Sequence, residues 1–259
     1  MTLPDHAAEY DPRGLPIKRV GITDLRYPVQ VLDRTDGMQA TVATMSLYVG
    51  LPHHFKGTHM SRFIEILNEV RGEFTFRTMP RILEQVRERL EADDAWVEME
   101  FPYFLTKTAP VSGAKSLMEY VGTFKGHRDA DGVDFTLGVT VPVKSLCPCS
   151  KSISDYGAHN QRSLVTVEIR SDEHVWLEDL IEAVEASASA PLYALLKRED
   201  EKFVTEQAYD NPKFVEDLVR DCVIAVRDLP GVRWIAVRAE NQESIHNHSA
   251  TAEIEWSRA

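Results

Sequence analysis

The chain has 259 residues, of which 43% are hydrophobic and 27% charged, and its formal net charge is −12. Such a composition suffices for one large domain or two small ones. The acidic balance argues against a nucleic-acid surface, which would need a basic stripe. An anionic small molecule stays compatible with it, because a phosphate needs only a few local cations or backbone N–H groups.

The sequence also limits the cellular location that we expect. No apolar run reaches the length of about 18 residues that is needed to span a membrane. The N-terminal residues lack the basic and apolar pattern of a secretory signal. Three cysteines, an odd number, argue against a disulfide framework. We therefore expect a cytoplasmic protein without a membrane anchor and without a nucleic-acid partner.

The first half of the chain alternates strand and helix patterns after a polar, proline-rich arm over residues 1–16. The turn dipeptide Asp36-Gly37 separates the first two expected strands. Apolar residues recur at helical spacing in the next two segments, and the second of these follows Pro80, which suits a first helical turn. In order, the expected elements are strands 19–33 and 39–51, helices over 60–70 and 82–90, and strands 95–107 and 117–126.

The second half repeats this order of elements. Apolar spacing predicts a helix over 177–184 and another that begins at Asn211-Pro212, and Cys222 on the apolar face of the latter is interpreted as a core residue. The strands expected here are 133–143, 163–170, 232–240 and 248–257. Two connections, 144–162 and 190–211, are unusually long for a compact domain, which is typical of functional loops.

The order of elements defines the fold that we predict. It is an α+β fold in which a ββααββ module occurs twice, with antiparallel sheets and helices on one face. The expected division is an N-terminal arm over 1–18, a first module over 19–130 and a second module over 131–259. No sequence identity supports the repeat, which rests on element order alone.

Chemistry is first suggested by Cys147-Pro-Cys149, which follows a strand, and by His159 at the end of the same loop. Thiolate and imidazole bind transition metals or attack carbon near neutral pH. Cysteines with one residue between them rarely bind the same metal ion, so we expect one to act and the other to be structural. A loop with two inactive thiols is the alternative, and a redox pair is less favoured because its usual spacing differs.

His246-Asn-His248 precedes the last strand. Residues two apart point the same way in an extended chain, so both imidazoles would face one point. This arrangement suits metal binding, or a general acid paired with a general base. Two solvated histidines in a hairpin are the alternative.

Three further features carry weaker signals. Glu201 and Glu206 belong to an acidic run that could supply a carboxylate ligand or simply form a solvated face. Glu216 borders the apolar stripe of its helix, where it could also be a partly exposed edge residue. His59 and Arg62 near a helix start could bind phosphate.

Several segments together resemble one family, the type IB GTP cyclohydrolases, and the resemblance extends over nearly the whole chain. The segments that carry it are Lys56-Gly-Thr-His-Met-Ser-Arg62, Ser145-Leu-Cys-Pro-Cys-Ser-Lys151, Asn160-Gln-Arg-Ser163, Asp200-Glu-Lys-Phe-Val-Thr-Glu206, Asn211-Pro-Lys-Phe-Val-Glu-Asp217 and Glu243-Ser-Ile-His-Asn-His248.

The resemblance implies a tunnelling fold with two ββααββ modules per chain, assembled as a homotetramer. It implies conversion of GTP and water into 7,8-dihydroneopterin triphosphate and formate, the entry to folate-type pterins and queuosine-type deazaguanines. It also implies a divalent metal ion, Zn²⁺ or Mn²⁺, with Fe²⁺ as a further candidate.

Roles follow residue by residue from the same resemblance. Cys147, His159 and Glu201 would bind the metal ion, while His246 and His248 would transfer protons, without a decision on which is acid and which is base. Glu216 would hold the purine edge, and Glu243 would lie near the base or ribose. The triphosphate would need cationic partners, for which the candidates are His59, Arg62, Lys144 and Lys151.

Two other functions fit some of these features. The nitrile reductase of the queuosine pathway also uses a cysteine, but it needs NADPH and its Glu-Ser-Lys-type motif is absent from this sequence. A zinc-stabilised binding module would use the same metal ligands without catalysis. Dinucleotide-binding and P-loop motifs are absent as well.

Overall fold

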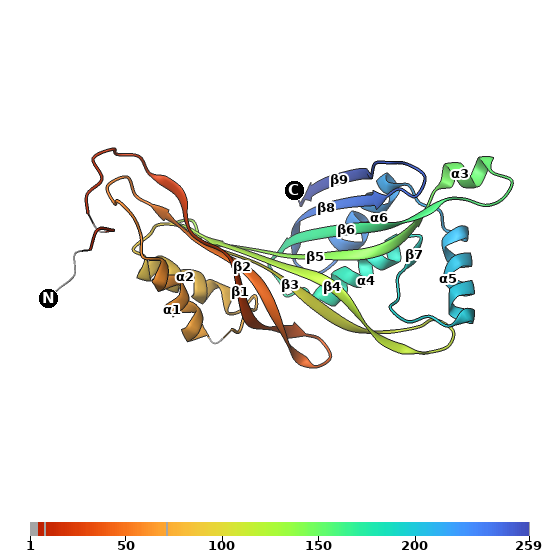
Figure 1. Ribbon diagram of the computed structural model, residues 1–259, viewed down its shortest axis with the longest axis horizontal. Helices are drawn as coiled ribbons and strands as arrows, with labels where there is room; N and C mark the ends of the chain where they lie inside the picture. The colour runs from red at the N-terminus through yellow and green to blue at the C-terminus, as the bar shows by residue number, and fades with distance from the viewer. Residues whose placement is uncertain (1–4, 8, 71, 259) are drawn as a thin grey trace. The chain divides into compact units, whose positions relative to one another are not determined.

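A computed structural model of the chain describes residues 5–7, 9–70 and 72–258 (Figure 1). The part of the predicted arm at residues 1–4 and 8 lies outside the described residues. The described residues contain nine strands and six helices. They form two compact units, one of Met1–Phe101 with Thr123–Thr136 and one of Pro102–Gly122 with Leu137–Ala259. Within the described part of the chain, no helix has the length and apolar character needed to cross a membrane.

The strands pair in the order β1-β2-β3-β4-β5-β6-β8-β9, and β7 pairs with β5. A mixed fold with antiparallel strands and helices is thus confirmed. The strands are β1 (Ile17–Asp33), β2 (Gly37–Leu51), β3 (Ala95–Thr108), β4 (Lys115–Arg128), β5 (Val133–Leu146), β6 (Asn160–Ser171), β7 (Ala190–Pro191), β8 (Val232–Gln242) and β9 (Ala250–Ser257).

The first unit begins with the predicted hairpin of β1 and β2. The Asp33 carboxylate accepts the backbone N–H groups of Thr35 and Asp36, and Gly37 has a φ of 80°, which favours glycine. Helices α1 (Met60–Val70) and α2 (Met79–Arg89) pack against each other. Their buried faces are those of the predicted apolar stripes.

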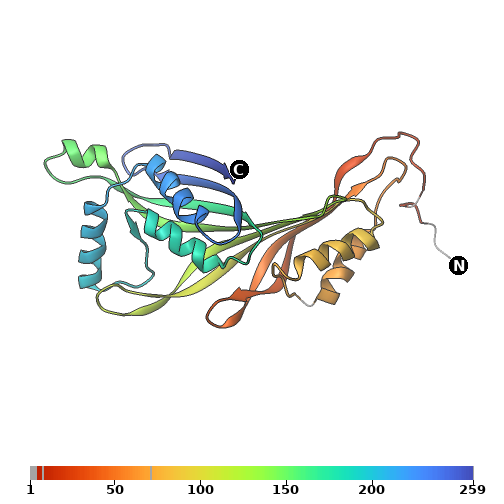
Figure 2. The same cartoon turned by 180° about the vertical axis from the view of Figure 1, so that it is seen from behind.

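The second unit places two helices on one face of its sheet. Helices α4 (Leu177–Ser187) and α6 (Val215–Arg227) contact each other and the strands β6 and β8, as Figure 2 shows from behind. Cys222 on α6 is fully buried, and burial raises the pKa of its thiol to about 12. The prediction that Cys222 is a core residue is therefore confirmed.

Three sequence predictions were wrong in this unit. The expected loop 144–162 contains the short helix α3 (Pro148–Ile153), and the expected loop 190–211 contains α5 (Arg198–Asp210). Helix α5 buries just two apolar residues, Val204 and Ala208, which is too few to give its sequence an apolar stripe. The last helix begins at Val215, because Asn211 ends α5 and its side chain donates to the Ala188 carbonyl.

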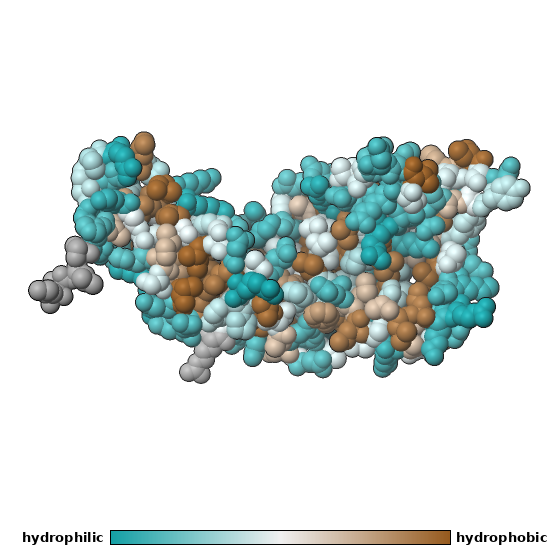
Figure 3. Space-filling model, in the orientation of Figure 1, coloured by the Kyte–Doolittle hydropathy of each residue, from teal (hydrophilic) through white to brown (hydrophobic). Residues whose placement is uncertain are grey.

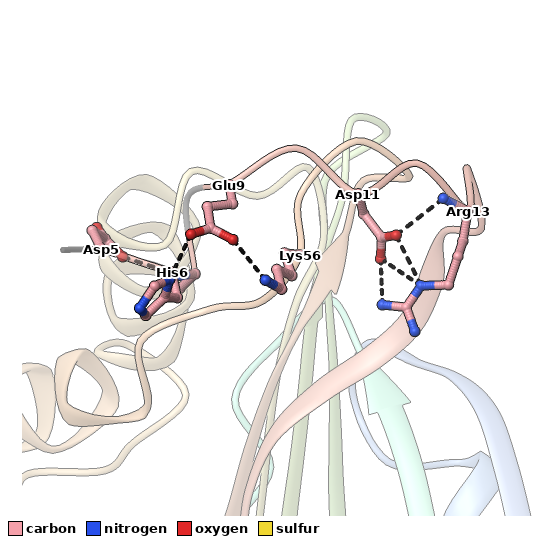
Figure 4. A network of polar contacts seen from close by, with 7 residues as sticks. Asp5, His6, Glu9, Asp11, Arg13 and Lys56 are labelled. Carbon is pink, nitrogen blue, oxygen red and sulfur yellow. Dashed lines mark hydrogen bonds and ion pairs between the residues drawn. The ribbon is translucent and has the colours of Figure 1, made fainter.

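The described arm residues are held by charged contacts (Figure 4). The Arg13 guanidinium donates to both oxygens of the Asp11 carboxylate, and these bonds lower the pKa of Asp11 to about 2. Glu9 accepts from Lys56 Nζ at 2.6 Å, in the connection before α1. The described residues of the arm before β1, which are 5–7 and 9–16, have turns and an isolated bridge from Tyr10 to Phe55 but no helix or long strand.

Candidate functional site

The two ends of the Cys147–His159 loop lie side by side. Strands β5 and β6 stay paired up to Leu146 opposite Asn160, and the Cys147 N–H donates to the His159 carbonyl at 3.1 Å. The loop therefore projects from the end of a β-hairpin, with its cysteine and its histidine at the base. This arrangement brings together two of the residues predicted to bind a metal ion.

Ser150 organises the base of this loop. Its backbone N–H donates to Cys147 Sγ at 3.5 Å, and its hydroxyl donates to the Cys147 carbonyl at 3.2 Å. The same hydroxyl accepts the backbone N–H of His159 at 3.2 Å. Cys147 is half-buried as the N-cap of α3, whereas Cys149 is exposed. The structure thus gives the two thiols different environments.

His159 is the centre of a polar cluster. Its side chain is only 12% exposed, and its Nδ1 lies 3.1 Å from Gln161 Oε1 and 3.7 Å from Glu243 Oε2. Histidines that bind metals usually donate the other ring nitrogen to an oxygen acceptor, which fixes the tautomer. With Nδ1 directed to these oxygens, Nε2 is the nitrogen suited to a metal ion.

The two histidines of the last connection lie beside His159. The rings of His159 and His246 have centroids 6.5 Å apart, and the rings of His246 and His248 stack with centroids 5.1 Å apart. His246 and His248 are exposed, while Glu243 is 11% exposed. The end of the hairpin therefore presents a thiol, three imidazoles and a carboxylate in one region.

A buried polar network lies beneath this cluster. The hydroxyls of Ser145 and Ser163 are 2.6 Å apart, and Ser163 donates to Asn241 Oδ1 at 2.5 Å. These side chains join β5, β6 and β8 where the strands approach the site. Since buried polar groups need partners, the network favours one arrangement of the strand ends.

Sequence reasoning did not assign roles to Ser150, Gln161, Ser163 or Asn241. Gln161 and Ser163 belong to the Asn160-Gln-Arg-Ser163 segment, one of those that carry the family resemblance, and this membership is the signal that could have found them. Asn241 could have been found from its position, because it follows Val237 and Ala239 at the same two-residue spacing along β8. All three residues are buried, and a polar residue on the buried side of a strand indicates a specific hydrogen-bonding role. Nothing in the sequence pattern indicated which atoms would meet.

The predicted ligand Glu201 and the predicted purine anchor Glu216 do not join the cluster within this chain. Glu201 is exposed in the first turn of α5, and Glu216 is exposed in the first turn of α6. Within the described residues, only one group of three or more ligand-type side chains has its ligand atoms within 4.8 Å of one another. That group is Asp94, His127 and Asp129 of the first unit, which sequence analysis missed.

The predicted phosphate cations fall into two places. Lys144 on β5 is half-buried, and burial lowers the pKa of its amine. Lys151 on α3 donates to the Tyr209 carbonyl and lies 4.2 Å from the centroid of the Tyr209 ring. His59 and Arg62 belong to the first unit, where Arg62 donates to the Arg89 carbonyl at 2.8 Å.

The start of α5, which carries Glu201, is fixed by the buried carboxylate of Asp200. This carboxylate accepts the backbone N–H groups of Val111 and Ser112 at 2.8 and 2.9 Å and the Ser112 hydroxyl at 2.5 Å. It also accepts the Lys197 N–H at 2.9 Å, which caps the helix. Burial alone would raise the pKa of Asp200, but these hydrogen bonds outweigh it and hold the pKa below its usual range.

Replacing Asp200 with asparagine should lower the melting temperature at pH 7 by roughly 5–10 °C, because an amide cannot accept all of these bonds. A carboxyl group whose pKa is lower in the folded than in the unfolded state stabilises the folded protein. This stabilisation is complete at pH values above the unfolded-state pKa of about 3.9, and it is lost as the pH falls towards the folded-state pKa. The difference between wild type and variant should therefore shrink below about pH 4. Thermal unfolding followed by circular dichroism at several pH values measures it.

The exposed neighbour Glu199 provides the matched control, and Glu199→Gln should melt like wild type at every pH. A difference for Asp200→Asn that stays constant down to acidic pH would contradict the assignment of the effect to the carboxylate.

Solved structures resemble this chain in fold. A uricase from Arthrobacter globiformis aligns with a TM-score of 0.52 and 10% identity, covering 93% of each chain. A uricase from Bacillus fastidious aligns with a TM-score of 0.51 and 8% identity, covering 92% of each chain. At such identity the likeness concerns the fold, which is that of the uricase-like tunnelling folds.

Sequence relatives are much closer. The protein named GTP cyclohydrolase FolE2 of Citrifermentans bemidjiense is 56% identical over 257 residues, which are 99% of this chain and 96% of that protein. The protein of the same name from Geobacter sulfurreducens is 55% identical over 253 residues, 98% of each chain. The family model for type I GTP cyclohydrolase folE2 matches residues 3–252. The chain therefore belongs to the family of type I GTP cyclohydrolases named FolE2.

Proposed function

We propose that this protein is a GTP cyclohydrolase of the type IB class, which converts GTP and water into 7,8-dihydroneopterin triphosphate and formate. The observation that carries the proposal is the cluster of Cys147, His159, Glu243 and His246, in a chain whose close relatives bear this enzyme's name. The reaction would be the first step of folate biosynthesis and would also supply precursors of queuosine. We propose a cytoplasmic location for it.

We further propose a divalent metal ion, Zn²⁺, Mn²⁺ or Fe²⁺, with Cys147, His159 and Glu201 as protein ligands. The fit is good for the first two, since the thiol is half-buried and His159 has Nδ1 directed to oxygen acceptors. Glu201 is exposed on α5 and would need to reach the other two ligands. When bound, such an ion lowers the pKa of a water molecule towards neutrality and so supplies a nucleophile.

The remaining chemistry belongs to side chains of the chain itself. Hydrolysis at C8 of guanine breaks the imidazole ring, releases formate and then closes a new ring, so protons must move to and from several nitrogen atoms. We propose that His246 and His248 carry them, since histidine is the side chain type that titrates nearest to neutral pH, and the stacking of the two rings supports a shared role. Their stacked rings are exposed, so a substrate could reach both.

Recognition of GTP is assigned to carboxylates and cations. We propose that Glu216 accepts hydrogen bonds from the purine edge and that Glu243, beside His159, lies near the base or ribose. Lys144, Lys151, His59 and Arg62 are the candidates for the triphosphate. The burial of Lys144 supports its assignment to the triphosphate. Burial disfavours the charged form of its amine and so lowers the pKa, and an anionic partner would stabilise that charged form.

We also propose a homotetramer in which a neighbouring subunit completes each site. Apolar side chains are exposed around the site in this chain, with Ile153 83% and Tyr156 100% exposed on or just after α3 and Ile245 64% exposed beside His246. Figure 3 shows hydrophobic residues at the surface among hydrophilic ones. Exposed apolar patches are typical of contact surfaces.

The two-module interpretation belongs to this proposal. Residues 1–18 would form the arm, 19–130 the first ββααββ module and 131–259 the second. The order β1, β2, α1, α2, β3, β4 in the first half supports it. In the second half, two helices, α4 and α6, again come before two strands, β8 and β9. Helices α3 and α5 would be additions to the second module.

The direct test is incubation of the protein with GTP and Zn²⁺, Mn²⁺ or Fe²⁺, followed by oxidation and detection of a fluorescent pterin. We expect product with at least one ion and none after chelation, while circular dichroism of the chelated protein stays folded. Unfolding on chelation would favour the zinc-stabilised binding module instead. Oxidation of NADPH with a nitrile substrate, in the absence of any pterin, would favour the reductase.

A further inference from the structure

A second group of ligand-type side chains lies in the first unit. Asp94 immediately precedes β3, His127 is near the end of β4 and Asp129 directly follows β4. His127 Nε2 is 3.4 Å from Asp94 Oδ1, and His127 Nδ1 is 3.9 Å from Asp129 Oδ2. All three side chains are half-buried, and one ligand atom from each lies within 4.8 Å of the others. None of them belongs to the Cys147–His159 cluster.

The imidazole of this group is held in place by an aromatic stack. The rings of His127 and Trp96 are nearly parallel, with centroids 4.6 Å apart and an angle of 4° between their planes. Trp96 also makes a cation–π interaction with Arg19, whose guanidinium carbon is 4.7 Å from the ring centroid. Trp96 itself is only 8% exposed. His127 is therefore oriented by a rigid neighbour, which lowers the entropy cost of binding a ligand.

The Asp129 carboxylate is oriented as well, and the backbone of Asp94 is fixed. Asp129 Oδ1 accepts the backbone N–H groups of Asp131 and Gly132, at 2.8 and 3.2 Å, and its Oδ2 is the oxygen nearer His127. Asp94 is paired through its backbone with Gly50, where a Cβ would stand 3.3 Å from Asp94 Oδ2. Glycine at this position thus leaves the Asp94 carboxylate room that a larger residue would restrict.

The group borders a cavity that is open to solvent. The cavity has a volume of about 580 Å³, and its lining includes Asp94, Trp96 and His127 together with Lys18 and His53. This space can hold the water molecules or the small anion that a metal ion needs when the protein supplies fewer ligands than its coordination number.

Charge decides what the group is suited to bind. Two carboxylates with a neutral imidazole carry two negative charges, and a protonated His127 would neutralise only one of them. A divalent cation neutralises both, and it is attracted more strongly in a half-buried place than in water. One nitrogen and two carboxylate oxygens suit first-row ions of intermediate softness, whereas a thiolate-containing site favours softer ions.

We propose that Asp94, His127 and Asp129 form a second divalent metal site, separate from the proposed catalytic one, which takes Mn²⁺, Fe²⁺ or Zn²⁺. The bound ion would tie the connection before β3 to the turn after β4 within the first unit. It would leave coordination positions on the cavity side for water or for an anionic ligand. This inference does not depend on the proposed function.

Mn²⁺ binding to metal-free protein in the Cys147→Ala background tests the proposal, because that change removes a ligand of the other site. Equilibrium dialysis with metal analysis should give one Mn²⁺ per chain, and Mn²⁺ should raise the melting temperature by mass action. Adding Asp94→Asn, or independently His127→Gln, should abolish both effects, with circular dichroism confirming that each variant is folded. Adding Glu100→Gln, a change at an exposed carboxylate of β3 outside the cavity lining, should abolish neither.

Absence of Mn²⁺ uptake by the Cys147→Ala protein up to millimolar free ion would overturn the proposal. So would uptake that persists in both the Asp94→Asn and the His127→Gln variants. The readout needs no GTP, so a failure of GTP turnover would count against the proposed function and leave this site untouched.

Discussion

Replacing Cys147 with alanine should lower GTP turnover by at least about 10³-fold while the protein stays folded. Residues that only orient a metal ligand typically cost roughly 10–100-fold, and loss of the ligand itself should cost more. The structural cost should be small, because the thiol accepts one long bond, from the Ser150 N–H at 3.5 Å. In one preparation of the variant, pterin fluorescence measures turnover, metal analysis measures the bound metal ion, and thermal unfolding measures stability.

Cys149 is the matched control for this prediction. It lies two residues away and is exposed, whereas Cys147 is half-buried. We expect Cys149→Ala to keep turnover and metal content near wild type. Equal losses of turnover in both variants would contradict the division of roles between the two thiols, and an active Cys147→Ala protein would remove Cys147 from the mechanism.

Replacing His246 or His248 with alanine should each lower kcat by roughly 10²-fold or more, within the 10²–10⁴-fold range typical of general acid–base residues. Exposed histidines that bury little surface contribute little to stability, so the melting temperature should hardly change. The kcat–pH profile should lose one limb in the variant that lacks the base and the other limb in the variant that lacks the acid. Steady-state kinetics across the pH range therefore assign the two roles.

Asn247, exposed between the two histidines, serves as the control. Asn247→Ala should keep the wild-type pH profile and most of the rate. If the His246→Ala and His248→Ala proteins lowered kcat without changing the shape of the profile, the pair would be positioning the substrate rather than transferring protons.

Most of the fold could be read from the sequence, because it is recorded in local patterns. The alternation along β5 buries Val139, Val141 and Val143, and the apolar spacing of α6 buries Leu218 and Cys222. Such patterns persist wherever one face of an element is buried. Helix α5 was missed because its start depends on the Asp200 carboxylate, whose partners Val111 and Ser112 are distant in sequence.

The sequence by itself determined which residues could carry chemistry, since the Cys147–His159 loop and His246-Asn-His248 are contiguous motifs of reactive types. Tertiary structure alone decided how they meet. The pairing of β5 with β6 brings Cys147 to His159, and the end of β8 brings Glu243 to the His159 ring. It also assembled Asp94, His127 and Asp129 from two segments that lie more than 30 residues apart in the sequence. Local sequence patterns do not predict such contacts, because strand pairing and side-chain packing set the distances between segments that are far apart in the chain.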